Sequence, residues 1–143
     1  MIFLDANIFP RALVDSSGPD SRRLHEIASR LLLQAGRGEF EVTTSDAVLA
    51  EIAFFLTARA HYQLPASVAA ALISPIVQLR GFRRPEKRAI LCAMEIWASV
   101  PRLGFVDALT LAYAQSPGMQ SAAFDSDFDN LPGVDRWQPE EAE

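Results

Sequence analysis

Short runs of strand length alternate along this chain with longer stretches of helical periodicity, and no other feature constrains the fold as much. Residues 1–4 and 121–124 are largely apolar runs, and residues 40–44 form a further run of similar length. A strand that is apolar on both faces is typical of a buried parallel sheet. Parallel neighbours are usually joined by helical crossovers. The order therefore predicts a three-layer α/β domain, with a mostly parallel four- to five-stranded sheet flanked by helices.

Caps and helix breakers mark the limits of the predicted helices. Asn, Ser, Asp and Pro favour a helix N-terminus, and Gly favours a C-terminus. On this basis the predicted helices span residues 7–14, 20–36, 45–60, 65–79, 85–99 and 105–116. Residues 81–84 are a candidate for an extended segment, and residues 134–137 for an edge strand.

The composition fits one domain in a reducing compartment. The chain has 143 residues, 50% of them hydrophobic, which is enough for a single well-filled core. Its apolar stretches are too short to cross a bilayer, and its N-terminus lacks the basic region of a signal peptide. The single cysteine, Cys92, excludes an internal disulfide. We therefore expect a cytoplasmic protein without a membrane segment.

The charge distribution alone does not decide whether nucleic acid is a partner. The net charge of −5 argues against it, because phosphate binding favours a basic surface. However, nearly all the cations are arginines, which bind phosphate in a bidentate manner. They cluster at Arg22 and Arg23 and again within residues 80–88. The acids concentrate at residues 125–129 and in residues 138–143, which form a predicted acidic C-terminal tail.

Four acidic residues occupy positions where the apolar pattern predicts a buried face or the end of a strand. Asp5 follows the first strand, and Asp125 follows the run at 121–124. In open α/β sheets, ligands bind beyond the carboxyl ends of the strands. Glu51 and Asp107 lie on or beside the apolar faces of their predicted helices. Acids are rarely buried unless they are paired or bind a metal ion.

Each acid taken alone also has a structural interpretation. Asp107 could complement the dipole of its helix, and Glu51 could pair with Arg11 or Arg59. The acids around position 125 could act locally in a turn. Taken together, however, an all-oxygen cluster suits Mg²⁺ or Mn²⁺ better than zinc. Because the sequence has no Cys/His metal spacing, nucleophile elbow or phosphate-binding loop, hydrolysis would require a metal-activated water.

Four segments together resemble the PIN-domain family, and more narrowly the VapC-type toxins of bacterial toxin–antitoxin pairs. They follow the family's order over essentially the whole chain: residues 2–9 (Ile-Phe-Leu-Asp-Ala-Asn-Ile-Phe), 43–51 (Thr-Thr-Ser-Asp-Ala-Val-Leu-Ala-Glu), 105–109 (Phe-Val-Asp-Ala-Leu) and 124–128 (Phe-Asp-Ser-Asp-Phe). The resemblance implies that residues 1–137 form a single PIN-like domain.

The resemblance also implies a metal-dependent endoribonuclease that hydrolyses RNA with a metal-activated water. Its catalytic acids would be Asp5, Glu51, Asp107 and Asp125. The ligands of one or two Mg²⁺ or Mn²⁺ ions would be Asp5, Asp107, Asp125 and Asp127. Between the last two, Asp125 is the preferred ligand because it ends the strand, with Asp127 as a helper.

Further residues would support this site. Asn7 and Ser45 would orient metal-bound waters or an acid, although Asn7 could equally be only a helix cap. Arg83, Arg84 and Arg88 are candidates for holding the RNA backbone, although a solvated face is an equal alternative. A toxin would also have an antitoxin that reaches the acidic site with an arginine, and homodimer formation is expected by analogy with the family.

The chain departs from the family at one position. Many members have Thr or Ser two residues before the fourth acid, whereas this chain has Ala123. A PIN-like module that binds metal or RNA without cleaving it is therefore an alternative. A phosphatase with an aspartyl nucleophile at Asp5 is a weaker alternative, because such enzymes need an acid where this chain has Asn7.

Overall fold

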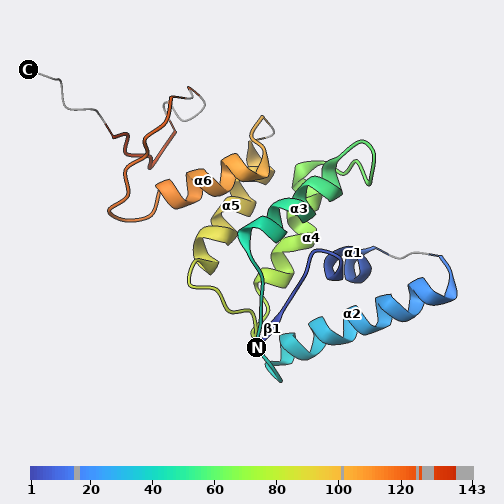
Figure 1. The fold of residues 1–143 in the computed structure, drawn as a ribbon. Coiled ribbons are helices and arrows are strands. Elements are labelled where there is room, and N and C mark those ends of the chain that lie inside the picture. The colour runs from blue at the N-terminus through green and yellow to red at the C-terminus, as the bar shows by residue number, and fades with distance from the viewer. Residues whose placement is uncertain (15–16, 101, 125, 127–130, 138–143) are drawn as a thin grey trace, which may run out of the picture.

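The computed structural model describes residues 1–14, 17–100, 102–124, 126 and 131–137. Its elements in chain order are β1 (Ile2–Phe3), α1 (Ile8–Leu13), α2 (Pro19–Arg37), β2 (Val42–Thr43), α3 (Asp46–Thr57), α4 (Ala66–Val77), α5 (Lys87–Ser99) and α6 (Phe105–Ala114) (Figure 1). No helix within the described ranges is long and apolar enough to cross a bilayer.

The sheet formed by the described residues is small and parallel. β1 pairs in parallel with β2, with Ile2 opposite Val42. Val42 directs its own N–H and carbonyl groups to the other edge of β2, where Phe82 forms an isolated parallel bridge. The extended segment predicted at 81–84 is therefore present beside β2. The parallel sheet among helices confirms the α/β class.

The strand predicted at residues 121–124 does not join this sheet. Ser121 instead forms an isolated parallel bridge with Arg136, and its N–H donates to the carbonyl of Asp135. Phe124 is fully exposed. The serine and two alanines of this run bury little apolar area, so local pairing satisfies the backbone groups without contact with β1. The described residues thus form two strands rather than four to five.

β1 is also more exposed than its apolar sequence predicts. The exposed fractions of Ile2 and Phe3 are 39% and 58%, whereas Leu4 is fully buried. The prediction of a strand covered on both faces was wrong for these two residues. Within the described part of the chain, β1 has a paired neighbour only on its β2 edge.

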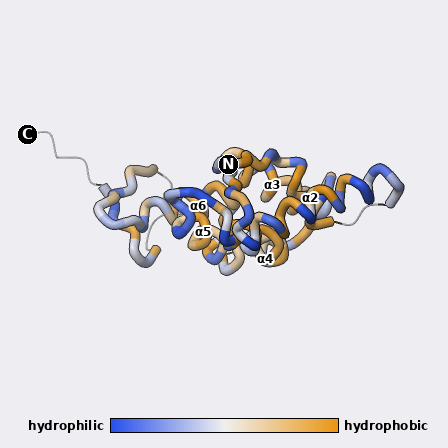
Figure 2. The backbone as a smooth tube through the Cα atoms, turned by 90° about the horizontal axis from the view of Figure 1, so that it is seen from below, coloured by the Kyte–Doolittle hydropathy of each residue, from blue (hydrophilic) through white to orange (hydrophobic). Residues whose placement is uncertain are grey.

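Helices lie on both sides of β1. In Figure 1, α1 and α2 lie to its right, and α5 and α6 lie to its left. α1 packs on α2, and α5 packs against both α4 and α6. Figure 2 shows α2 and the segment after α6 toward opposite ends of the molecule. This arrangement agrees with the predicted layers of helices flanking a sheet.

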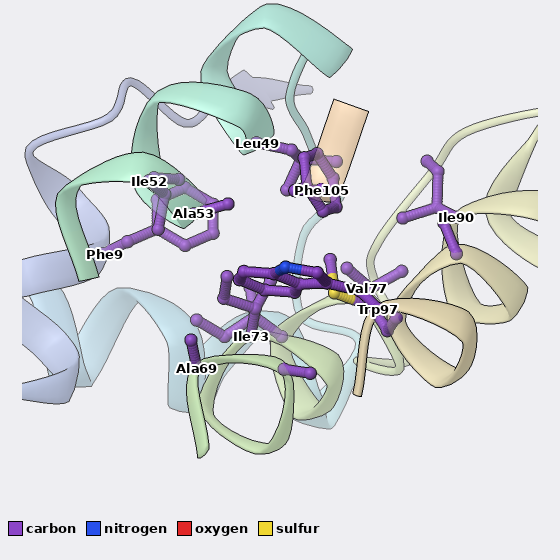
Figure 3. Packing of buried hydrophobic residues seen from close by; sticks show 14 of the residues in the cluster. Phe9, Leu49, Ile52, Ala53, Ala69, Ile73, Val77, Ile90, Trp97 and Phe105 are labelled. Atoms are coloured by element: carbon purple, nitrogen blue, oxygen red, sulfur yellow. The ribbon is translucent and has the colours of Figure 1, made fainter. Parts of the chain in front are cut away.

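One continuous hydrophobic core holds these helices together (Figure 3). Its members include Phe9, Ile52, Ile73, Trp97 and Phe105. The rings of Trp97 and Phe105 meet edge to face, with centroids 5.4 Å apart and an interplanar angle of 70°. Burying one side chain of this size stabilises the fold by about 1.5–3 kcal/mol. The core thereby fixes α3 and α6, the two helices that carry predicted catalytic acids.

The helix ends confirm several predicted caps. Ser45 caps α3, and its Oγ accepts a hydrogen bond from the Val48 N–H over 3.2 Å. Gly38 ends α2 with a φ of 75°, a left-handed conformation that favours glycine. α2 begins at Pro19, slightly earlier than predicted, because proline suits the first position of a helix. α3 ends at Thr57, earlier than predicted, because the next residue is extended.

Candidate active site

Asp5 lies directly beyond the carboxyl end of β1, as predicted. The preceding residue, Leu4, is fully buried. Its N–H donates to the Thr43 carbonyl over 2.7 Å, and its carbonyl accepts from Thr44 Oγ1 over 2.8 Å. Both backbone groups of Leu4 are thus satisfied, which fixes the end of the strand. Asp5 itself is exposed, so its carboxylate is accessible to a ligand.

Glu51 projects from α3 beside the buried face of that helix. Leu49, Ile52 and Leu56 of α3 are buried and form its inner face. Glu51 is exposed. It precedes Ile52 by one position, which turns its side chain about 100° away from that residue. Glu51 was predicted to lie on or beside the apolar face of its helix, and the structure places it beside that face.

Glu51 and Asn7 line the same pocket, which has a volume of about 370 Å³. Its walls come from α1, the residues before α1, α3 and the loop after α3. The lining residues are Ala6, Asn7, Pro10, Arg11, Val14, Glu51, Ile52, Phe55 and Tyr62. Because Ala6 and Asn7 directly follow Asp5, the pocket adjoins the carboxyl end of β1. The structure thus brings Asn7 and Glu51 together next to Asp5.

Asn7 and Ser45 differ in how their side chains are engaged. Asn7 precedes α1 with helical backbone angles, and its side chain makes no capping hydrogen bond. Asn7 therefore occupies the N-cap position of α1 without the side-chain hydrogen bond of a cap, and the residue lines the pocket. The Oγ of Ser45 is an acceptor in the cap of α3, while its hydroxyl proton stays available for donation.

Asp107 lies in the first turn of α6. It is exposed, whereas Phe105, Ala108 and Leu109 of the same helix are buried. A Cβ placed on Gly104, the N-cap residue, would lie 3.9 Å from Asp107 Oδ2, so the carboxylate turns back toward the N-terminus of its helix. There it complements the helix dipole. Asp107 is not among the residues that line the pocket.

The acids within the described residues do not complete a metal site by themselves. In these ranges, no three His, Cys, Asp or Glu side chains form a group that could hold a metal ion. The acids predicted at Asp125 and Asp127 lie outside the described residues. By donor type, Asp5, Glu51 and Asp107 fit a hard divalent cation, and all three are exposed. The described part of the site therefore supplies suitable oxygen donors without a closed ligand set.

A polar network that the sequence analysis missed joins α3 to α6. Tyr113 of α6 donates its hydroxyl proton to Asp46 Oδ2 over 2.8 Å. Arg84 Nη2 lies 3.0 Å from Asp46 Oδ1, although the two are not aligned as a hydrogen bond. Arg84 also donates to Glu86 over 3.0 Å and to the Thr44 carbonyl over 2.9 Å. The sequence places Asp46 near the start of a predicted helix and Tyr113 near the end of another, but no motif links the two residues.

The pKa values of this network follow from burial and pairing. Burial raises the pKa of Tyr113 to about 12, and its hydrogen bond to Asp46 adds to the effect. Burial by itself lowers the pKa of Arg84, but the hydrogen bond to Glu86 and the charge of Asp46 raise it overall. A hydrogen bond from its own backbone lowers the pKa of Glu86, as does the bond from Arg84. Near neutral pH Tyr113 is thus protonated, whereas Arg84 and Glu86 are charged.

The three arginines predicted to hold RNA differ in their surroundings. Arg84 has a side chain that is only 16% exposed and is engaged in the network. Arg83 pairs with Glu41 over 2.7 Å and donates to the Arg80 carbonyl. Arg88 is exposed on the first turn of α5. The geometry therefore favours a structural role for Arg84, whereas Arg88 is exposed and accessible to a phosphate.

Comparison with protein families decides the identity of this fold. The family model for the PIN domain matches residues 2–134, which include every described element and the pocket. The chain belongs to the PIN-domain family. PIN domains are generally nucleases, so the chain has a nuclease-type fold. No curated protein matches it in sequence.

Proposed function

We propose that this PIN domain is an endoribonuclease that hydrolyses RNA phosphodiester bonds with a metal-activated water. The observation that carries the proposal is the pocket in which Asn7 and Glu51 meet beside Asp5. This is the carboxyl end of β1, where α/β sheets bind their ligands. Membership of a family of nucleases supports the same class of chemistry.

A divalent cation fits this site by the chemistry of the donors. Asp5 and Asp107, together with Asp125 or Asp127, would hold one or two Mg²⁺ or Mn²⁺ ions. The ion would supply positive charge to the phosphate and acidify a water molecule. The carboxylate of Glu51 would orient that water and accept its proton.

Other residues of the chain would position the substrate. Asn7 lines the pocket, and its amide can donate to a phosphate oxygen or to the Glu51 carboxylate. The exposed guanidinium of Arg88 can contact the RNA backbone. The buried anchoring of Leu4 keeps the backbone of Asp5 in one position, which preorganises the site.

We further propose that the protein is the toxin of a toxin–antitoxin pair of the VapC type. The antitoxin would place an arginine among the exposed acids and so neutralise the site. Exposed apolar side chains such as Phe3 and Val106, at 58% and 60%, offer surface for self-association as a homodimer. The free thiol of Cys92 suits a reducing cytoplasm.

The test is cleavage of labelled total RNA by the purified protein with Mg²⁺, Mn²⁺ or EDTA. We expect cleavage that requires the metal ion and disappears in Asp5→Asn and Asp107→Asn. The matched control is Asp20→Asn, which removes an exposed acid from the first turn of α2. Cleavage by both site variants at the wild-type rate would contradict the assignment of these acids.

The second candidate function is a PIN-like module that binds without cleaving. It is favoured by the absence of a three-acid group within the described residues and by Ala123 in place of a hydroxyl side chain. Calorimetric titration with Mn²⁺, read together with the cleavage assay, separates the two candidates. A folded protein that binds the ion and RNA but cleaves no RNA supports the binding module, and Ala123→Thr should then introduce activity.

A further inference from the structure

The pocket beside Asp5 has an aromatic end that the proposed hydrolysis does not use. Phe55 of α3 and Tyr62 of the following loop line it. The ring of Phe55 is covered by His61, with centroids 4.3 Å apart, and by Tyr62, with centroids 5.3 Å apart. Tyr62 is 39% exposed, so it offers the accessible ring.

The loop that carries Tyr62 is tied back to α3. His61 and Gln63 both donate their N–H groups to the Ala58 carbonyl, over 3.0 and 3.1 Å. Leu64 N–H donates to the Leu56 carbonyl over 2.8 Å. Gln63 has a φ of 51°, which is uncommon for a residue other than glycine. These backbone hydrogen bonds hold the loop, and the edge contact with Phe55 places the ring of Tyr62 at the pocket.

The polar groups of the pocket select the class of ligand. Glu51 supplies an anion and Asn7 an amide that both donates and accepts. Arg11 supplies a cation, and its Nη1 also donates to Ser21 Oγ of α2 over 3.5 Å. A purely anionic ligand would be repelled by Glu51, and an apolar peptide face would leave these groups without partners. A flat, neutral ring with donors and acceptors on its edge could stack on the aromatic side chains and form hydrogen bonds with the polar side chains of the pocket. A nucleobase has this chemistry.

We propose that this pocket binds a nucleobase of the RNA strand next to the phosphate that is cleaved. The base stacks on Tyr62, and its edge meets Asn7 and Arg11. This subsite rests on the proposed function, because it places one base beside Asp5 and Glu51. A pocket of about 370 Å³ lies within the range of small-molecule sites in proteins.

The test measures binding of a short single-stranded RNA to protein in which Asp107→Asn prevents cleavage, since Asp107 does not line the pocket. Fluorescence anisotropy would report the affinity for Tyr62→Leu, Tyr62→Phe and Phe54→Leu in this background. Stacking contributes about 1–3 kcal/mol per base, so Tyr62→Leu should weaken binding by about tenfold. Tyr62→Phe keeps the ring and should bind within about twofold of its parent. Phe54→Leu removes a 68% exposed ring of α3 outside the pocket and should have no effect.

An RNA of the same length made of abasic ribose phosphates identifies the base as the ligand. The parent protein should bind the abasic strand about tenfold more weakly than the normal strand. Tyr62→Leu should bind the abasic strand no more weakly than the parent protein does. An equal loss of affinity in Tyr62→Leu for both RNAs would show contact with the backbone and overturn the proposal. If Tyr62→Leu bound RNA as tightly as its parent, the pocket would have another occupant, such as a protein segment. This result would also overturn the nucleobase proposal.

Failure of the base pocket can be told apart from failure of the ribonuclease function. If wild-type protein cleaves RNA and Tyr62→Leu cleaves it with the same kcat/KM, only the pocket proposal fails. If the wild type neither cleaves nor binds RNA, both fail. Circular dichroism and thermal unfolding of each variant confirm that it is folded before these results are compared.

Discussion

Tyr113 of α6 donates its hydroxyl proton to Asp46 at the start of α3, over 2.8 Å. The two residues are 67 positions apart in the chain. This bond, together with the Arg84 ion pair to the same carboxylate, holds the helix that carries Asp107 against the helix that carries Glu51. The relative placement of two predicted catalytic acids therefore depends on a network that lies outside the pocket.

Removing this hydroxyl should weaken the link between α3 and α6. Tyr113→Phe keeps the ring but leaves Asp46 without its donor, which should lower the free energy of unfolding by about 1–2 kcal/mol. Urea denaturation measures the change. Tyr62→Phe is the matched control, since Tyr62 lies in the pocket, and it should change stability by less than about 0.5 kcal/mol. Equal effects of the two substitutions would contradict a specific role for the Tyr113 bond.

The same hydroxyl should give stability a dependence on alkaline pH. The pKa of Tyr113 is about 12 in the folded chain, whereas that of an unfolded tyrosine is about 10. Because the folded pKa is raised, its contribution to stability is complete below about pH 10 and is lost as the pH rises toward about 12. The free energy of unfolding should therefore fall more steeply over this interval in wild type than in Tyr113→Phe. Parallel pH profiles for the two proteins would count against the shifted pKa.

Substitution of Arg84 should lower stability, whereas substitution of Arg88 should weaken RNA binding. Arg84→Ala leaves Asp46 and Glu86 without their cation and should lower the free energy of unfolding by about 2 kcal/mol. Arg88→Ala should change stability by less than about 0.5 kcal/mol. It should nevertheless weaken RNA binding and reduce the dependence of that binding on salt. Thermal unfolding and salt titrations of both variants measure these effects, and a stable Arg84→Ala protein would refute the structural role.

The helices could be predicted from the sequence because their signals are local. Ser45 caps α3 through a bond to a residue three positions away, and Gly38 ends α2 with its own backbone angle. Asp5 could be placed beyond a strand because the apolar run before it is short and continuous. These features depend on few neighbours in the fold, so a pattern of residue types is sufficient to find them.

The tertiary partners could not be predicted in the same way. The bond from Tyr113 to Asp46 joins distant segments, and neither residue stands out in its local sequence. Ser121 begins a run that resembles a strand, but its partner is Arg136 rather than a residue of β1. The pattern of apolar residues indicates that a segment can be extended, but it does not indicate which strand the segment pairs with. The aromatic end of the pocket was missed because Phe55 and Tyr62 carry no motif.

Glu51 tests the central claim most directly, because it is the predicted catalytic acid that lines the pocket. The measurement is the rate of RNA cleavage by Glu51→Gln in the presence of Mg²⁺ or Mn²⁺. Glu95→Gln is its matched control, since Glu95 is an exposed acid on α5 outside the pocket. We predict that Glu51→Gln lowers the rate by about a hundredfold or more, corresponding to roughly 2.7 kcal/mol of transition-state stabilisation, and that Glu95→Gln retains the wild-type rate. A Glu51→Gln protein that cleaves RNA as fast as wild type would contradict the account.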